Sequence, residues 1–248
     1  MKDLHQDQSP TALVTGAGAR VGRAIAYELA RHHFHVILHY HRNQKGVEET
    51  LHQVKVLGGS GTIVQADLSQ HSPREHLIQQ VKAHSTHLKV LVNNASLFEP
   101  QAFASLQLED WRQMHEVNLV APYVLAQGLL TELTTAQGVI VNLCDISADN
   151  PLKGYAHYTA SKAGLVGLTK ALAVELAPRI RSVGISPGQV AWPPEYTDQQ
   201  KQKLLNRIPM KQSGTPEDVA RLVRFIVNEG SYLNGVIIPV DGGLSCRY

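Results

Sequence analysis

The sequence predicts an α/β fold in which helices cover both faces of a doubly wound parallel sheet of about seven strands. Short β-rich runs alternate with amphipathic runs of helical period from residue 11 to the end of the chain. The chain has 248 residues, of which 43% are hydrophobic and 18% are charged, so it can bury a full core. No change in composition marks a second domain.

Strands are expected at 11–15, 34–39, 62–66, 89–93, 138–143, 182–186 and 236–240. Helices are expected between them at 20–31, 47–57, 72 to about 83, 108 to about 133, 155–176 and 216–227. In the first helix, Ile25, Leu29 and Ala30 share one face. The second helix stops at Gly58-Gly59, and Pro178 ends the helix at 155–176 because proline cannot continue it.

Residues 11–248 are expected to form a single domain. Residues 1–10 are polar, lack the apolar segment of a signal peptide, and are expected to form a flexible N-terminal tail. One long irregular stretch, 187–215, follows a strand end, where ligands bind in sheets of this kind. We expect a substrate loop there, and a surface excursion without function is the alternative.

Charge and cysteine content restrict the class of protein. The net charge of +2 predicts neither a nucleic-acid partner nor a membrane partner. The apolar runs are all shorter than the ~18–20 residues that a membrane span needs. Two cysteines, Cys144 and Cys246, are too few for a disulfide framework and favour a reduced, cytoplasmic setting. The 13 histidines are scattered without metal-ligand spacing, so no metal is expected.

A glycine-rich turn, Thr15 to Gly22, joins the first expected strand to the first helix. Small residues such as Gly16 let the backbone approach a pyrophosphate, and the helix N-terminus supplies N–H groups and positive potential. A simple tight turn is the alternative, but the position at the start of a βαβ unit favours dinucleotide binding. The fold class is therefore the Rossmann type.

The second strand ends in His39-Tyr40-His41-Arg42-Asn43. A NAD-preferring enzyme of this fold usually has an acidic residue there for the ribose 2′-hydroxyl. This segment has none and offers Arg42 and His41, while Arg20 in the glycine-rich turn adds a second guanidinium. Guanidinium groups bind phosphate in a bidentate manner, so the sequence predicts NADPH over NADH. An Arg42 that only faces solvent is the alternative.

Polar residues also follow the third and fourth strands. Asp67, with Leu68 after it, can accept a hydrogen bond from an adenine amino group, or it can cap the next helix. The fourth strand ends in Asn93-Asn94-Ala95-Ser96. Paired asparagines there can tie neighbouring strands and line a cofactor cleft, whereas ordinary turn asparagines are the alternative.

Tyr158 and Lys162 stand four residues apart, a spacing that places them on one face of a helix. A neighbouring ammonium favours the phenolate, so we expect the pKa of Tyr158 to lie below its reference value of about 10. The pair would then give or take a proton near neutral pH. Asp145 precedes Tyr158 by thirteen residues. Asn118, an amide in an apolar run, is expected to be a core residue that can also kink the helix and hold a water next to Lys162.

With these residues assembled, the chain resembles the short-chain dehydrogenase/reductase family over essentially its whole length. The matching segments are Thr15-Gly16 to Gly22, Asn93-Asn94-Ala95, Asn118, Tyr158 to Lys162, Pro187-Gly188 and Asp241-Gly242-Gly243. The family's usual catalytic serine would fall at the position of Asp145. That departure, together with Arg20, Leu38 to Arg42 and Val141 to Asp145, makes the sequence similar to the pteridine reductases.

The resemblance implies NADPH-dependent reduction of dihydropterins, with oxidised pterins and folates as further candidate substrates. Phe98 and the nicotinamide would sandwich the pterin ring, although a lone phenylalanine is also common in a core. Asp145 would work with Tyr158 in protonating a ring nitrogen, and Lys162 would bind the nicotinamide ribose. Homotetramers, with the final strand and the long helices at their interfaces, are usual in the family.

The expected catalytic residues are Asp145, Tyr158, Lys162 and Asn118. The residues expected to contact the cofactor are Gly16, Arg20, Val21, Gly22, Tyr40, His41, Arg42, Asn43, Asp67, Leu68, Asn94, Ala95, Ser96, Tyr158, Lys162, Pro187 and Gly188. The residues expected to contact the substrate are Arg20, Ser96, Phe98, Asp145, Tyr158 and Trp192, the last as a wall of the pocket.

Charge alone also separates two activities at Asp145. An ionised aspartate would repel a ketone oxygen that gains negative charge, whereas an imine reductase delivers a proton to nitrogen, which a carboxylate can assist. A loop-capping aspartate is the structural alternative. A short-chain reductase of a 3-oxoacyl thioester or a quinone is the second enzymatic interpretation. An NADPH-binding regulator without activity is the third, and the presence of both Tyr158 and Lys162 argues against it.

Overall fold

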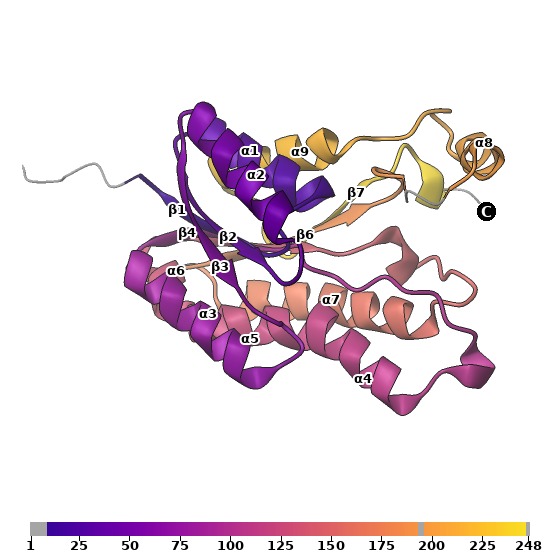
Figure 1. The fold of residues 1–248 in the computed structure, drawn as a ribbon, viewed down its shortest axis with the longest axis horizontal. Coiled ribbons are helices and arrows are strands. Elements are labelled where there is room, and N and C mark those ends of the chain that lie inside the picture. Colours follow the sequence, from indigo (N-terminus) through magenta and orange to yellow (C-terminus); the bar gives the residue numbers. More distant parts are fainter. Residues whose placement is uncertain (1–8, 193–195, 247–248) are drawn as a thin grey trace, which may run out of the picture.

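A computed structural model describes residues 9–192 and 196–246. The strands in this part of the chain form one parallel sheet in the order β3-β2-β1-β4-β5-β6-β7 (Figure 1). Their bounds are β1 Thr11–Val14, β2 His35–Tyr40, β3 Ser60–Gln65, β4 Leu88–Asn93, β5 Val139–Leu143, β6 Arg181–Pro187 and β7 Ile237–Val240. The order reverses between β1 and β4, which confirms the predicted doubly wound α/β fold.

Helices cover both faces of the sheet (Figure 1). One layer contains α1 Arg20–Arg31, α2 Gln44–Val56 and α9 Pro216–Asn228. The other contains α3 His71–His84, α4 Leu108–His115, α5 Ala121–Gly128, α6 Leu130–Thr135 and α7 Ala156–Glu175. Short 3₁₀ turns occur at η1 Phe103–Ser105, η3 Ile146–Ala148 and η4 Leu244–Cys246.

Two hydrophobic cores follow from the alternation of side chains along the strands. Ala12 and Val14 of β1 belong to the core that contains Ile25 of α1. Leu13, between them, belongs to the core that contains Leu77 of α3. Because both faces of the sheet are buried, the strands are fixed relative to one another, and their carboxyl ends form one edge of the sheet. The polar residues predicted to form the site lie at this edge.

The expected helix at 108–133 is interrupted. A π-helical turn, η2 Glu116–Val120, separates α4 from α5. Two residues explain it. Pro122 lies in the first turn of α5 and has no N–H for a regular helical bond. The Asn118 side chain instead bonds the backbone of Leu97, accepting from its N–H at 2.8 Å and donating to its carbonyl at 3.1 Å. The kink that was expected at Asn118 is therefore present.

The expected irregular stretch 187–215 contains a helix, α8 Asp198–Arg207, which the sequence reasoning missed. Thr197 and Gln200 form a capping box, in which each side chain bonds the other residue's backbone N–H. This is a sequence-readable start signal. Residues 193–195 of this stretch, and residues 1–8 of the expected tail, lie outside the described residues. Within the described residues, the helices are too short or too polar to cross a membrane.

Candidate active site

A cleft of about 1440 Å³ lies at the carboxyl ends of the strands, across the point where the strand order reverses. It runs from the glycine-rich turn, past the ends of β4 and β5, to α8. The structure brings all the expected site residues to its lining except two, Asn118 and Trp192.

The glycine-rich turn has the shape of a phosphate cradle. Gly16 has a φ of +67°, and a Cβ on Gly22 would collide with the carbonyl oxygen of Gly16 and the side-chain amide of Asn94. Helix α1 begins after Ala19 without a side-chain cap or an acidic residue in its first turn. Its N–H groups and positive potential therefore face the cleft, so these residues fit the pyrophosphate of a dinucleotide cofactor.

His39 supports this turn from below, a role that the sequence reasoning did not assign. Its buried ring accepts a hydrogen bond from the Gly16 N–H at Nδ1, at 3.1 Å, and donates from Nε2 to the Ala66 carbonyl, at 3.0 Å. These partners fix the neutral tautomer. Burial lowers the pKa of His39 to about 4, although the bond to Ala66 opposes the shift. The only sequence signal was a histidine inside an apolar strand.

This histidine gives a prediction about stability and pH. Because the pKa falls from 6.5 to about 4 on folding, the unfolded chain binds more protons between these values. The contribution of neutral His39 to the free energy of unfolding is therefore complete above about pH 6.5. This contribution is lost as the pH falls toward 4, by about 3 kcal/mol in total. The free energy of unfolding is measured in urea at pH 7 and at pH 5. The difference between the two pH values should be smaller for His39→Gln than for the wild type. Equal changes in the two proteins would contradict the assignment.

The end of β2 presents basic side chains to the cleft. His41 and Arg42 are exposed there, and His41 lies 3.7 Å from Asp67 across the β2–β3 pair. Asn43 instead caps α2, accepting from the Gly46 N–H, and its amide donates to the Gly18 carbonyl of the glycine-rich turn. The strand end has no acidic residue of its own, and the nearest carboxylate in this lining is that of Asp67 after β3.

Asp67 does not cap a helix, so that alternative was wrong. Its carboxylate accepts from the N–H and hydroxyl of Ser69 in a local turn, and α3 begins later, at His71. Burial alone would raise the pKa of Asp67, but the Ser69 hydrogen bonds and the nearby His41 and Arg42 lower it. Asp67 is therefore an ionised acceptor beside the cleft.

The paired asparagines tie neighbouring strands, as expected. Asn93 of β4 donates to the side chain of Asn142 of β5 at 2.8 Å. Asn94 donates to the Thr15 carbonyl at 2.7 Å and lines the cleft with Ala95. The backbone N–H groups of Asn94 and Ala95 both donate to the Thr15 hydroxyl, so the ends of β1 and β4 hold a fixed geometry.

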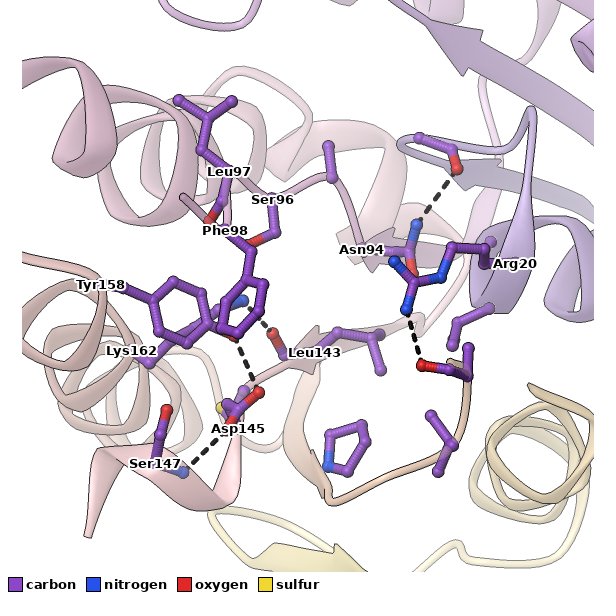
Figure 2. A pocket seen from close by; sticks show the side chains of 18 of the residues that line it. Arg20, Asn94, Ser96, Leu97, Phe98, Leu143, Asp145, Ser147, Tyr158 and Lys162 are labelled. Carbon is purple, nitrogen blue, oxygen red and sulfur yellow. Dashed lines mark hydrogen bonds between the residues drawn. The ribbon is translucent and has the colours of Figure 1, made fainter. Parts of the chain in front are cut away.

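Three groups meet at the base of the cleft, where β5 ends beside α7 (Figure 2). The Tyr158 hydroxyl donates to Oδ2 of Asp145 at 2.8 Å. The other oxygen of Asp145 accepts from the Ser147 N–H at 2.7 Å, which fixes the carboxylate in orientation. The Lys162 ammonium donates to the Leu143 carbonyl at 2.7 Å. Asp145 thus caps the η3 turn and also contacts Tyr158, so its two interpretations are compatible.

The predicted direction of the Tyr158 pKa was wrong. Burial raises the pKa of this hydroxyl well above 10, and the neighbouring Asp145 carboxylate, which accepts its proton, raises it further. Lys162 does not offset these effects because its ammonium is bound to Leu143, 5.7 Å from the centre of the Tyr158 ring. The hydroxyl is therefore protonated throughout the neutral range. Burial also lowers the pKa of Lys162.

Asn118 is buried behind this group rather than in the cleft lining. Its amide donates to the Ser161 hydroxyl, at 3.1 Å, and its Oδ1 accepts from Ser96, at 3.2 Å. Asn118 therefore joins the loop after β4 to α7. Its partner on α7, Ser161, lies between Tyr158 and Lys162 in the sequence. Its contacts assign it a positioning role, and both of its predicted descriptions, a core amide and a kink, hold.

An aromatic side chain, Phe98, lies beside Tyr158 in the cleft lining. The Phe98 ring stacks on Tyr155, with ring centres 4.5 Å apart, and meets Tyr158 edge-on at 4.8 Å. It is 44% exposed and lines the cleft, so it is not a core residue (Figure 2). A planar ligand can pack against its uncovered surface.

Trp192 is not among the described residues that line the cleft, and its role as a pocket wall stays a prediction. The Trp192 and Tyr196 ring centres lie 6.3 Å apart, and Tyr196 does line the cleft. Arg20 donates from its guanidinium to the Ala191 carbonyl at 2.9 Å, and Gln189 donates to the same oxygen at 2.8 Å. The Arg20 bond ties the start of the 187–215 stretch to the glycine-rich turn, and the Gln189 bond lies within that stretch.

A phosphate cradle at the reversal of a parallel sheet, with a tyrosine and a lysine beside it, defines a dinucleotide-dependent oxidoreductase. The family model described as Enoyl-(Acyl carrier protein) reductase matches residues 16–245. The chain therefore belongs to the short-chain dehydrogenase/reductase family. Enzymes of this family use a nicotinamide dinucleotide, NAD(H) or NADP(H).

Curated relatives cover nearly the whole chain. Glucose 1-dehydrogenase 2 of Bacillus subtilis is 32% identical over 243 residues, which cover 95% of this chain and 94% of that protein. The 3-oxoacyl-(acyl-carrier-protein) reductase FabG of Staphylococcus epidermidis is 30% identical over 239 residues, covering 94% and 98%. The 3-oxoacyl-(acyl-carrier-protein) reductase of Synechocystis is 30% identical over 238 residues, covering 94% and 96%.

Proposed function

We propose that the chain is an NADPH-dependent reductase of a C=N bond in a dihydropterin, such as 7,8-dihydrobiopterin. The observation that carries this proposal is the 2.8 Å hydrogen bond from Tyr158 to the carboxylate of Asp145. In a ketone reductase, the groups around the reacting oxygen must donate to it as negative charge develops. A carboxylate at that place accepts instead. It suits a ring whose amino and N–H groups need acceptors and whose imine nitrogen needs a proton.

The proton that reaches the imine nitrogen would come from Tyr158. NADPH, when bound, would supply the hydride that the imine carbon gains. The nitrogen then gains a basicity far above that of a phenolate, so even a hydroxyl with a raised pKa can protonate it. Asp145 holds the hydroxyl in place through the bond at Oδ2, while its other oxygen is fixed by Ser147. Lys162, whose ammonium is held by the Leu143 carbonyl, would bind the nicotinamide ribose, as the family resemblance implies.

Phe98 would bind the flat face of the pterin. Its ring is partly exposed above Tyr158, and Tyr155 supports it from one side. Ser96, held by Asn118, offers a hydroxyl on the same wall of the cleft. A planar heterocycle with hydrogen-bonding edges fits these groups better than an acyl chain does.

For the cofactor, we propose NADPH with its 2′-phosphate at His41 and Arg42. Replacing Arg42 with glutamate should lower kcat/KM for NADPH about 100-fold and that for NADH less than about three-fold, because only NADPH has this phosphate. Lys45→Glu makes the same charge change on α2, outside the cleft lining, and is the matched control. Steady-state kinetics with both cofactors measure the effect. An equal loss for both would show that Arg42 does not contact the phosphate.

A second candidate is supported by the relatives. They are named for glucose and for 3-oxoacyl-carrier-protein substrates, which are oxidised or reduced at C–O bonds. This supports a carbonyl reductase better than it supports a pteridine reductase. The pterin proposal is nevertheless preferred because a carboxylate, that of Asp145, lies next to the Tyr158 hydroxyl.

The family resemblance further suggests that the protein is a cytoplasmic homotetramer.

The proposal is tested by following NADPH oxidation by the purified protein with 7,8-dihydrobiopterin and identifying the product by mass. Formation of tetrahydrobiopterin at a rate proportional to protein concentration is expected. Oxidation no faster than without substrate would reject the pterin activity, and the 3-oxoacyl thioester acetoacetyl-coenzyme A would then be the next substrate to measure.

A further inference from the structure

Helix α8 turns one face toward the cleft. Gln200, Lys203, Leu204 and Arg207 all line the cleft, and their spacing places them on a single side of the helix. The helix is fixed at both ends. The capping box with Thr197 holds its start, and Ile208, which follows its last residue, is 1% exposed. The face of α8 is therefore part of the wall of the site.

Two cations on this face have no carboxylate partner within the part of the chain that the structure describes. Among the ion pairs of the described residues, Lys201 pairs with Asp198 at 3.4 Å, but neither Lys203 nor Arg207 takes part in one. Like charges four residues apart on a helix repel each other. The helix dipole favours a cation at Arg207, in the last turn, but gives no reason for Lys203 beside it. Both charges would be compensated by an anion in the cleft.

The position of α8 indicates which anion this is. The cradle for the cofactor phosphates belongs to the turn after β1, and the cations for a 2′-phosphate follow β2. α8 lies in the loop after β6, on the other half of the sheet, where Tyr196 and Ala191 also line the cleft. The ring site at Phe98 and Tyr158 opens toward the same cleft. An anionic group attached to the substrate ring would lie in the cleft that α8 also lines.

We propose that Lys203 and Arg207 form an anion-binding pair that selects substrates with a phosphate or carboxylate on the side chain. The inference rests on the proposed dihydropterin activity for the ring that bears this side chain. It assigns specificity to α8, whereas the chemistry stays with Tyr158 and Asp145. Ammonium and guanidinium groups bind phosphate and carboxylate oxygens by charge-assisted hydrogen bonds.

The test uses two substrates that differ only in the anion, 7,8-dihydroneopterin and its 3′-phosphate. The ratio of kcat/KM for the phosphorylated over the neutral substrate is measured for the wild type and for the double variant Lys203→Gln/Arg207→Gln. Lys201→Gln removes one positive charge from the same helix outside the cleft lining and is the control, beside the single variants Lys203→Gln and Arg207→Gln, which each remove one charge from the cleft face. The KM for NADPH is measured for each protein.

We expect the double variant to lower the ratio about ten-fold and Lys201→Gln to leave it as in the wild type. The ratio in the wild type should also fall as salt is added, because Lys203 and Arg207 are exposed and salt screens exposed charges. An unchanged ratio would overturn the proposal. So would a rise in the KM for NADPH with no change in the ratio, because the cations would then contact the cofactor phosphates.

Failure of the pterin activity is distinguishable from failure of the anion site. If the wild type reduces neither dihydroneopterin substrate, the proposed function is wrong. The same variants are then compared on acetoacetyl-coenzyme A, which carries phosphates, and on the neutral N-acetylcysteamine thioester. A ten-fold fall in the preference for the coenzyme A form would retain the anion site, and an equal preference in all these proteins would reject it.

Discussion

Replacing Tyr158 with phenylalanine is expected to lower kcat for 7,8-dihydrobiopterin about 1,000-fold, within the range that general acids contribute. The change removes only the hydroxyl, whose one hydrogen bond is to Asp145. The ring stays available for its edge contact with Phe98, and Asp145 keeps its bond from Ser147. Loss of rate should therefore reflect the missing proton donor and not a collapsed site.

Single-turnover measurement with saturating NADPH checks this result, since it excludes product release. Binding of NADPH, followed by its fluorescence, shows whether the cleft is intact in the variant. A fall in the single-turnover rate of less than about ten-fold would mean that another group, or water, delivers the proton.

Replacing Asp145 with serine is expected to act in opposite directions on two substrates. kcat/KM for 7,8-dihydrobiopterin should fall about 100-fold, because the carboxylate that orients the donor is lost. That for acetoacetyl-coenzyme A should rise, because a neutral hydroxyl can donate to the developing oxyanion where the carboxylate would repel it.

The matched control for this change is Asp149→Ser. Asp149 lines the same cleft four residues further on and accepts no hydrogen bond from Tyr158. Removing its charge should alter both activities far less than removing that of Asp145. Similar losses in the two variants would attribute the effect to the overall charge of the cleft, and unchanged pterin turnover in Asp145→Ser would remove Asp145 from the mechanism.

The fold could be predicted from the sequence because its main signal is periodicity. Apolar runs at regular spacing, with a glycine-rich turn after the first, specify a parallel sheet with little dependence on distant contacts. The predicted helix boundaries are wrong where the hydrogen bonds of single side chains or a proline determine where a helix starts or breaks. The Asn43 side chain starts α2 three residues earlier than expected, at Gln44. Pro122 and Asn118 break one expected helix, and the capping box at Thr197 starts another.

The location of the candidate site in the fold could be predicted, because the carboxyl ends of parallel strands meet at one edge of the sheet. Contacts within the site were not predictable. The sequence could not show that Lys162 binds the Leu143 carbonyl, or that burial and Asp145 raise the pKa of Tyr158. The direction of Trp192, and the support that His39 gives to Gly16, depend on tertiary packing alone.

The most direct test of the proposed function is a competition in one reaction. The wild-type protein is given equal concentrations of 7,8-dihydrobiopterin and acetoacetyl-coenzyme A with limiting NADPH, and both products are quantified. The product ratio then reports the ratio of the two kcat/KM values. We expect tetrahydrobiopterin to exceed the hydroxyacyl product by more than about ten-fold. An excess of the hydroxyacyl product would contradict the account and would identify the chain as a carbonyl reductase.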